Sequence, residues 1–152
     1  MTIRKPYQRV RPVKDAVFYR AWALAHPFCQ CCGVPEAAAP NAPGCGGISL
    51  STHHIVKFKR SDEACNLLRL CQRCHDLAEM RSVRVKGELL PLLYLSVVLT
   101  IKRVRDPDAW DPARLEILFG RPLPDPDPVP AFAEESYRRW RPSPFYPCDV
   151  IA

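Results

Sequence analysis

Cys29-Gln30-Cys31-Cys32-Gly33 and Cys71-Gln72-Arg73-Cys74-His75 are the two motifs from which the architecture of this chain can be read. Between them stand a double histidine, Thr52-His53-His54-Ile55, and the pair Asn66-Leu67. This order places a candidate clamp of two Cys-x-x-Cys pairs around polar residues that could bind a second metal ion and activate water.

The paired cysteines are typical of a structural zinc site. Tetrahedral zinc takes four thiolates at about 2.3 Å, and two intervening residues let one tight turn present both sulfur atoms to the same ion. Gly33 follows the first pair, where a tight turn can use a glycine. The expected zinc ligands are Cys29, Cys32, Cys71 and Cys74, with Cys31 or Cys45 as substitutes. The alternative is that the cysteines are buried small hydrophobic residues.

The chain has the size of a single domain. With 152 residues it can bury a modest core, roughly two-thirds of its unfolded surface. Its 47% hydrophobic and 25% charged residues indicate a globular protein. The first residues show no secretory signal, so we expect a cytoplasmic protein whose paired cysteines bind metal instead of forming disulfides. The most apolar run, residues 89–101, is too short to span a membrane, and no membrane partner is expected.

Positive charge predominates, most clearly near the N-terminus. Lysine and arginine outnumber aspartate and glutamate by 22 to 16, which gives a formal net charge of +6. Such an excess favours a polyanionic partner such as DNA. Residues 1–14 form the expected basic arm, whose candidate phosphate contacts are Arg4, Lys5, Arg9 and Arg11. The alternative is a solvated basic segment without a partner.

Local sequence signals predict an α+β protein. We expect a helix over residues 15–26, ended by Pro27, and a surface loop over 34–47. Short strands over 48–52 and 66–70, separated by a charged turn at 57–65, lead into a helix over 71–80. Two further helices are expected over 90–105 and 112–119, the second with Asp111 as N-cap and Gly120 just past its end.

The composition changes after Gly120. Prolines then stand at every second position from Pro122 to Pro128, a pattern that can neither pair inside a sheet nor continue a helix. We therefore expect three segments: the basic arm 1–14, a zinc-stabilised domain with flanking helices over 15–120, and a proline-rich extended tail over 121–152. Aromatic residues near the end suggest that this tail could dock on a protein partner: Tyr137, Trp140, Phe145 and Tyr146.

The double histidine, Asn66 and the Cys-x-x-Cys-His motif together resemble the HNH endonuclease family. The resemblance covers about residues 28–80, and residues 67–74 separate Asn66 from His75 as in the common family pattern. It implies a small ββα-metal core with structural zinc. Two departures are Lys57, where many members have proline, and the charged residues 57–63, which replace a glycine-rich turn. Neither removes a catalytic group.

The resemblance also implies roles for the residues of this core. His54 would be the general base, His53 and His75 ligands of a catalytic ion such as Mg²⁺, and Asn66 a residue that orients the base or braces the adjoining loop. Phosphodiester hydrolysis needs an activated water and compensation for developing negative charge, which a neutral histidine and one divalent ion can supply. Glu79, one helical turn after His75, could add a ligand or could be an ordinary exposed helical glutamate.

The sequence thus predicts a metal-dependent HNH endonuclease that hydrolyses DNA phosphodiester bonds, with the size and bare architecture of phage-encoded members of that family. Basic residues near the expected site are further candidates for DNA contact: Lys57, Lys59, Arg60 and Arg73. The alternative is a zinc-dependent module that binds nucleic acid without cutting it. In that case a histidine of the double pair could replace a cysteine at the zinc, and His75 could be a surface cap.

Overall fold

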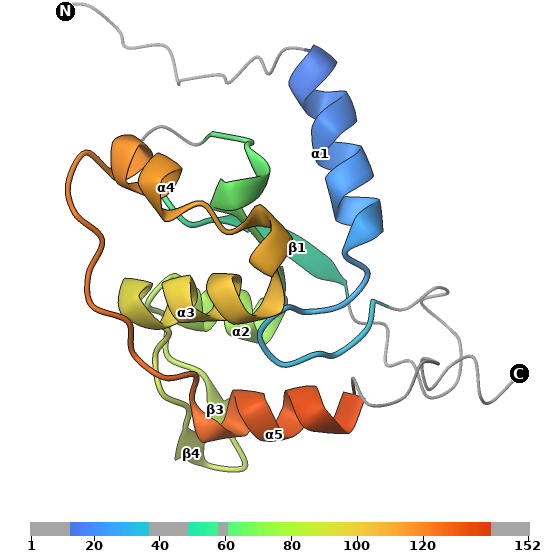
Figure 1. The fold of residues 1–152 in the computed structure, drawn as a ribbon. Helices are drawn as coiled ribbons and strands as arrows, with labels where there is room; N and C mark the ends of the chain where they lie inside the picture. The colour runs from blue at the N-terminus through green and yellow to red at the C-terminus, as the bar shows by residue number, and fades with distance from the viewer. Residues whose placement is uncertain (1–12, 37–48, 58–60, 141–152) are drawn as a thin grey trace, which may run out of the picture.

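A strand hairpin followed directly by a helix forms the centre of the molecule (Figure 1). The structure is a computed structural model that describes residues 13–36, 49–57 and 61–140. Helix α1 (Val13–Ala25) leads into the first cysteine pair, strands β1 (Leu50–His54) and β2 (Leu67–Cys71) are antiparallel, and helix α2 (Gln72–Ala78) begins where β2 ends. This mixture of helices and a small sheet agrees with the predicted α+β class.

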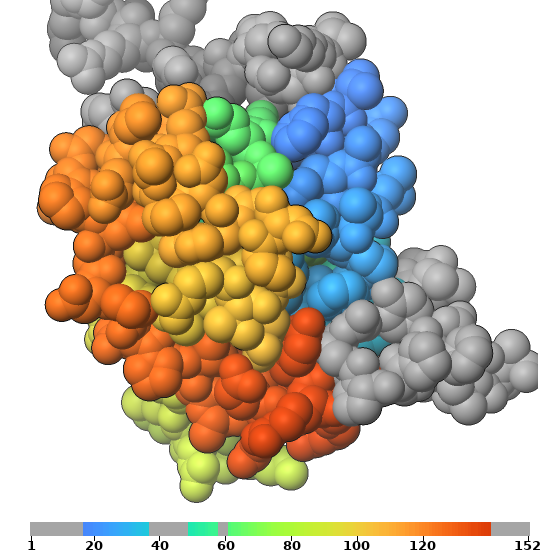
Figure 2. Space-filling view, viewed as in Figure 1, coloured from blue at the N-terminus to red at the C-terminus, as the bar shows by residue number. Residues whose placement is uncertain are grey.

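The remaining elements surround this centre. Strands β3 (Arg84–Val85) and β4 (Glu88–Leu89) form a second, short hairpin, and helices α3 (Leu95–Arg105), α4 (Pro112–Phe119) and α5 (Ala131–Trp140) follow. Short 3-10 helices, η1 (Ala64–Asn66) and η2 (Pro107–Ala109), precede β2 and follow α3. Figure 2 shows α3 in gold between α4 in orange and α5 in red, with α1 in blue beside them. None of the helices in these described ranges has the length and apolar character that a membrane crossing requires.

Strand β2 supplies much of the core. Its residues Leu67, Leu68 and Leu70 are almost completely buried on both faces of the hairpin. Such a continuous apolar run is expected for a strand that is covered on both sides. It packs in one hydrophobic cluster with leucines and isoleucine from the helices and their connections, among them Leu77, Leu93, Ile101 and Leu115.

A buried lysine holds α3 against the segment before β2. The side chain of Lys102 is 0% exposed, and its ammonium donates hydrogen bonds to the carbonyl oxygens of Ala64 and Leu67 at 2.7 Å each. A third hydrogen bond, of 2.6 Å, goes to Oδ2 of Asp106. The same carboxylate oxygen lies 3.7 Å from His26 Nε2, so Asp106 also connects α3 to the end of α1.

The sequence predicted the ends of helix α4 correctly but not the start of helix α3. Helix α4 is confirmed: Asp111 accepts a hydrogen bond of 3.1 Å from the Arg114 backbone nitrogen, and Gly120 has a left-handed φ of 77°. Helix α3 begins at Leu95 and not at residue 90. The predicted start was wrong because the Leu90 backbone nitrogen donates to the Val83 carbonyl oxygen, at 2.9 Å, which keeps this residue in the β3–β4 hairpin.

The first strand is displaced toward the histidines relative to the predicted residues 48–52. It runs from Leu50 to His54, so both histidines belong to the strand, and residue 48 lies outside the described residues. The predicted strand at 66–70 runs from Leu67 to Cys71, because Asn66 ends the preceding 3-10 helix. The paired register sets His53 opposite Leu68 and His54 opposite Leu67.

The prediction that residues 121–152 are extended was wrong for residues 131–140, which form helix α5. The helix follows Pro130 and is held by packing: Ala133 is fully buried, and the Ser136 hydroxyl donates a 2.8 Å hydrogen bond to the Cys32 carbonyl oxygen. Arg105 adds a hydrogen bond of 3.0 Å to Glu134. Residues 1–12 of the predicted basic arm 1–14 and residues 141–152 lie outside the described residues, and with them the predicted contacts Arg4, Lys5, Arg9 and Arg11.

Candidate metal centres

The first cysteine pair lies in a tight turn before the central hairpin. The Gly33 backbone nitrogen donates to the Cys29 carbonyl oxygen, and the Cys29 nitrogen donates to the Val34 carbonyl oxygen, both at 2.8 Å. Gly33 has a φ of 79°, a left-handed conformation that glycine adopts without a steric penalty. Gln30 attaches this turn to β2, because its backbone nitrogen and side-chain oxygen bind the Arg69 backbone at 2.8 Å each.

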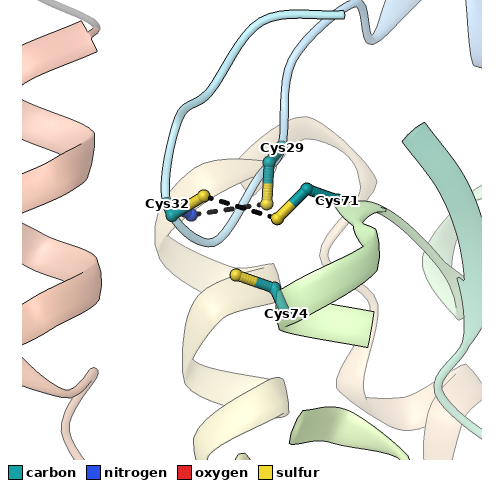
Figure 3. Close-up of side chains that lie close together, drawn as sticks. All are labelled: Cys29, Cys32, Cys71 and Cys74. Atoms are coloured by element: carbon teal, nitrogen blue, oxygen red, sulfur yellow. Dashed lines mark hydrogen bonds between the residues drawn. The ribbon is translucent and has the colours of Figure 1, made fainter. Parts of the chain in front are cut away.

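The structure brings the four predicted cysteines together (Figure 3). Their sulfur atoms all lie within 4.8 Å of one another, and all four side chains are buried: Cys29, Cys32, Cys71 and Cys74. The sulfur atoms of Cys32 and Cys71 are 3.7 Å apart. A tetrahedron with zinc–sulfur bonds of about 2.3 Å has edges of about 3.8 Å, whereas a disulfide bond measures about 2.05 Å. The cluster could therefore hold a metal ion such as zinc.

The electrostatics of the cluster favour a bound cation. Burial raises the pKa of the Cys29 thiol, whereas hydrogen bonds from the neighbouring cysteines lower the pKa of Cys32. Arg73 lies beside these sulfur atoms: burial opposes its charge, but the thiolates of the cluster raise its pKa. Its Nε is buried and finds no hydrogen-bond partner within the part of the chain that the structure describes. The predicted contact of Arg73 with DNA stays a prediction, and its position beside the cysteines supports a role in balancing thiolate charge.

Of the two substitute ligands, only Cys31 lies within the described residues, and it does not join this cluster. Cys31 is completely buried, but the group of mutually close donor atoms contains its two neighbours in the motif and not Cys31 itself. Cys45 lies outside the described residues.

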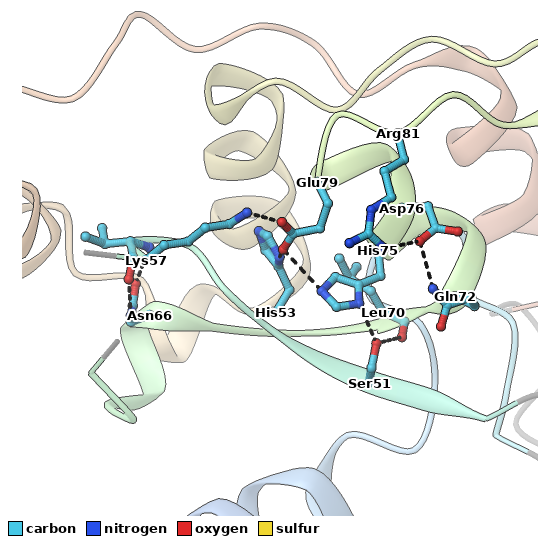
Figure 4. A network of polar contacts seen from close by, with 11 residues as sticks. Ser51, His53, Lys57, Asn66, Leu70, Gln72, His75, Asp76, Glu79 and Arg81 are labelled. Carbon is cyan, nitrogen blue, oxygen red and sulfur yellow. Dashed lines mark hydrogen bonds and ion pairs between the residues drawn. The ribbon is translucent and has the colours of Figure 1, made fainter. Parts of the chain in front are cut away.

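A second group of side chains that could hold a metal ion forms where β1 faces α2 (Figure 4). It consists of His53 from β1, His75 from α2 and Glu79 at the C-terminal end of that helix, with donor atoms within 4.8 Å of one another. Oε1 of Glu79 is 3.3 Å from His53 Nδ1 and 3.4 Å from His75 Nε2. The two predicted histidine ligands thus meet, and the glutamate left open by the sequence lies between them.

The charge states of His53 and Glu79 suit a divalent cation. Burial and the nearby His75 lower the pKa of His53 to about 4, so its ring is neutral near pH 7. His53 Nδ1 is buried and has no hydrogen-bond partner among the described residues. The other oxygen of Glu79 pairs with the Lys57 ammonium, which lowers the pKa of this carboxyl although burial opposes the shift. Two imidazole rings, of which that of His53 is neutral, and a carboxylate therefore face one point.

Ser51 orients one of the ligands, and sequence reasoning missed it. Its hydroxyl lies 3.0 Å from His75 Nδ1, the ring nitrogen that faces away from Glu79. Partners of this kind fix the ring of a metal-binding histidine. The signal was present in the strand pattern, because Ser51 and His53 are two residues apart and side chains of a strand alternate between its faces.

His54 takes a different partner from His53. Its Nε2 lies 2.7 Å from Asp62 Oδ1, and both side chains are mostly buried. Asn66 makes the contacts of a loop brace, which is one of the two roles left open for it. Its side-chain oxygen accepts from the Val56 nitrogen at 2.7 Å, and its amide donates to the carbonyl oxygens of Val56 and Ser61 at 3.2 and 3.0 Å.

Of the remaining basic residues predicted to contact DNA, Lys57 is half-exposed beside the histidine cluster, where it pairs with Glu79. Lys59 and Arg60 lie outside the described residues.

We compared the chain with protein-family models, curated proteins and solved structures. None of these comparisons found a match. The chain is thus a mixed helix and small-sheet protein with a cysteine cluster that could hold zinc. A second cluster, of two histidines and a glutamate, lies beside Lys57.

Proposed function

We propose that this protein is a metal-dependent endonuclease of the HNH type that hydrolyses DNA phosphodiester bonds. The observation that carries the proposal is the convergence of His53, His75 and Glu79 on one point, within 4.8 Å of one another, on a hairpin and helix held by the cysteine cluster. The residue next to His53 in the same strand, His54, is a histidine paired with a carboxylate, and we assign it as the base.

The donor set fits a divalent ion. The buried Nδ1 of His53 has no hydrogen-bond partner in the described part of the chain, as expected for an atom reserved for a ligand. Three protein ligands leave coordination positions for a phosphate oxygen and water. A divalent ion bound here would polarise the scissile phosphate and stabilise the charge that develops on the leaving oxygen. The ligand residues His53, His75 and Glu79 hold that position, and Ser51 keeps the ring of His75 in place.

His54 has the surroundings of a general base. Asp62 can accept a hydrogen bond from the Nε2–H of His54, which would fix the tautomer of this ring. The carboxylate also stabilises the imidazolium that forms when His54 takes a proton from water. His54 would thus accept the proton of the attacking water, and Asp62 would act through it as a positioning residue.

The cysteine cluster would have a structural part in this activity. Cys71 ends β2 and Cys74 lies in the first turn of α2, directly before His75. A zinc ion held by the four thiolates would fix the start of α2 against the first cysteine turn. The helix that carries His75 and Glu79 would thereby be positioned by a metal that takes no part in the chemistry.

Nicking of supercoiled plasmid DNA by the zinc-loaded protein tests the proposal. We expect nicking that requires Mg²⁺, Mn²⁺ or Ni²⁺, and His54→Ala is expected to slow it roughly 10²- to 10⁴-fold, the usual effect of losing a positioned base. Glu79→Ala should raise the metal concentration needed for half-maximal nicking. Asp76→Asn is the matched control, because the Asp76 carboxylate lies on the same helix but faces Gln72 and Arg81.

Wild-type nicking by His54→Ala would contradict the assignment of the base. DNA binding without nicking under any of these metals would instead favour the alternative, a zinc-dependent module that binds nucleic acid and leaves it intact.

A further inference from the structure

A cavity of about 490 Å³ opens beside the histidine cluster. His53 belongs to its wall, together with residues that follow β1, the end of α2, the start of α3 and the end of α4. Its volume lies within the range of about 300–1,000 Å³ that is usual for ligand pockets. The cavity and the candidate metal site therefore share a wall, although the predicted chemistry uses only the metal site.

The lining of this cavity is apolar inside and cationic at two positions. Aliphatic side chains form half of the wall: Ile55, Val56, Ala78, Leu93, Leu95 and Val98. Tyr94, Phe119 and Met80 add large, polarisable surfaces, and the Arg121 guanidinium lies 4.3 Å from the centre of the Phe119 ring. Lys57 and Arg121 are its charged members, and among the described residues no carboxylate lines it.

We propose that this cavity holds one unstacked nucleobase of the DNA substrate, adjacent to the phosphate at the histidine cluster. A base offers two apolar faces that fit between aliphatic and aromatic side chains, and the phosphates beside it are anions that suit Lys57 and Arg121. The inference rests on the proposed function, because the neighbouring phosphate is the one that would be cut. The substrate would then be single-stranded DNA, or a duplex opened at one nucleotide.

Met80, which lines this cavity, has an unfavourable backbone conformation. Met80 has a φ of 62°, the left-handed conformation that follows many helices and that is normally taken by glycine. A residue with a side chain is disfavoured there. The methionine nevertheless occupies this position directly after Glu79 and contributes its side chain to the cavity.

A pair of oligonucleotides separates contacts with bases from contacts with phosphates. One is a 12-nucleotide thymidine strand, and the other has the same phosphates but an abasic residue at every position. Binding of each to the zinc-loaded full chain is measured by fluorescence anisotropy without added Mg²⁺. We expect the strand with bases to bind about 5- to 150-fold more tightly, the range for stacking one base.

Variants locate this preference in the cavity. Tyr94→Ala should bring the two affinities close together while leaving the affinity for the abasic strand unchanged. The Tyr94 side chain is 58% exposed, so its loss should leave the fold intact. Ile117→Ala is the matched control, since Ile117 is a 61% exposed apolar residue of α4 that does not line the cavity, and it should keep the wild-type preference.

The outcomes separate this inference from the proposed function. Equal affinities of the wild type for both strands would overturn the inference, and so would binding of neither strand; persistent plasmid nicking would show that the proposed function stands nonetheless. An unchanged preference in Tyr94→Ala would also overturn it and would point to another occupant, such as a side chain of a protein partner. Loss of the preference in Tyr94→Ala, without nicking by any variant, would support the cavity as a base site in a protein that binds but does not cut DNA.

Discussion

Replacing Lys102 with methionine removes a positive charge that is wholly buried between α3 and the segment before β2. The ammonium makes three hydrogen bonds, to the carbonyl oxygens of Ala64 and Leu67 at 2.7 Å and to Asp106 at 2.6 Å. Methionine has a similar length but cannot donate a hydrogen bond. The substitution therefore leaves the buried Leu67 carbonyl and the partly buried Ala64 carbonyl without this donor, and takes from the carboxylate its nearest cation.

The expected loss of stability is about 3–5 kcal/mol, the usual result of removing one partner from a buried ion pair. For a chain of 152 residues, each 1 kcal/mol corresponds to a change in Tm of about 2–4 °C, so Tm should fall by about 6–20 °C. The hydrophobic surface that methionine retains offsets little of this loss, because the lysine stem already fills the same space.

Urea unfolding, followed by far-ultraviolet circular dichroism at a fixed zinc concentration, measures this difference, since bound metal changes apparent stability by mass action. Arg103→Met is the matched control on the same helix. Arg103 is exposed, so its loss should change the free energy of unfolding by no more than about 0.5 kcal/mol. A loss below about 1 kcal/mol for Lys102→Met, or equal losses for both variants, would refute the reasoning.

Three further predictions concern the same fold. Cys74→Ser should abolish zinc binding and unfold the hairpin and α2, since zinc binding can contribute about 10 kcal/mol or more to the folding of small domains; full zinc content by atomic absorption and an unchanged Tm would contradict this. Asp106 raises the pKa of His26 above 6.5, so the stability that His26 adds is present below pH 6.5 and is lost as the pH rises through the raised value. His26→Gln should therefore flatten the decline in unfolding free energy between pH 6 and 9, and an identical pH profile for both proteins would exclude the ion pair as its source. Met80→Gly should stabilise the fold by about 1 kcal/mol in urea unfolding by relieving the left-handed φ, and a decrease in the free energy of unfolding would contradict this.

The parts of the fold that could be predicted depend on signals within a few residues. The spacing of the cysteines and the glycine after the first pair indicated a turn that presents two sulfur atoms. Asp111 and Gly120 marked both ends of α4, because a side chain that caps a helix and a left-handed residue that ends it act locally. The grouping of the four cysteines followed from such local signals and from the preference of zinc for four ligands.

Other parts could not be predicted, because they depend on contacts between distant segments. The partner of His54 is Asp62, a loop residue whose position is set by the path of the chain between the strands. Lys102 looked like an ordinary helical lysine, and only the packing of α3 buries it. Helix α5 was not predicted because prolines precede it. Glu134 in its first turn and the arginines in its last turn nevertheless interact favourably with the helix dipole.

The histidine cluster lies between these two cases. The order of the motifs predicted that His53 and His75 would meet, but whether Glu79 faces them depends on the angle of α2 to β1. Ser51 could have been found from the alternation of the strand, had the bounds of β1 been known.

Helix α2 imposes a rule on any redesign of this protein. Neighbouring residues of an α-helix project about 100° apart around its axis. Cys74 therefore turns toward the sulfur cluster, while His75, the very next residue, turns toward the histidine cluster. Side chains at either centre can be exchanged one at a time, but inserting or deleting a single residue between Cys71 and Glu79 would rotate one set of ligands away from the other. The two centres thus depend on the same helical register, and the segment that carries them can be changed in length or transplanted only as a unit.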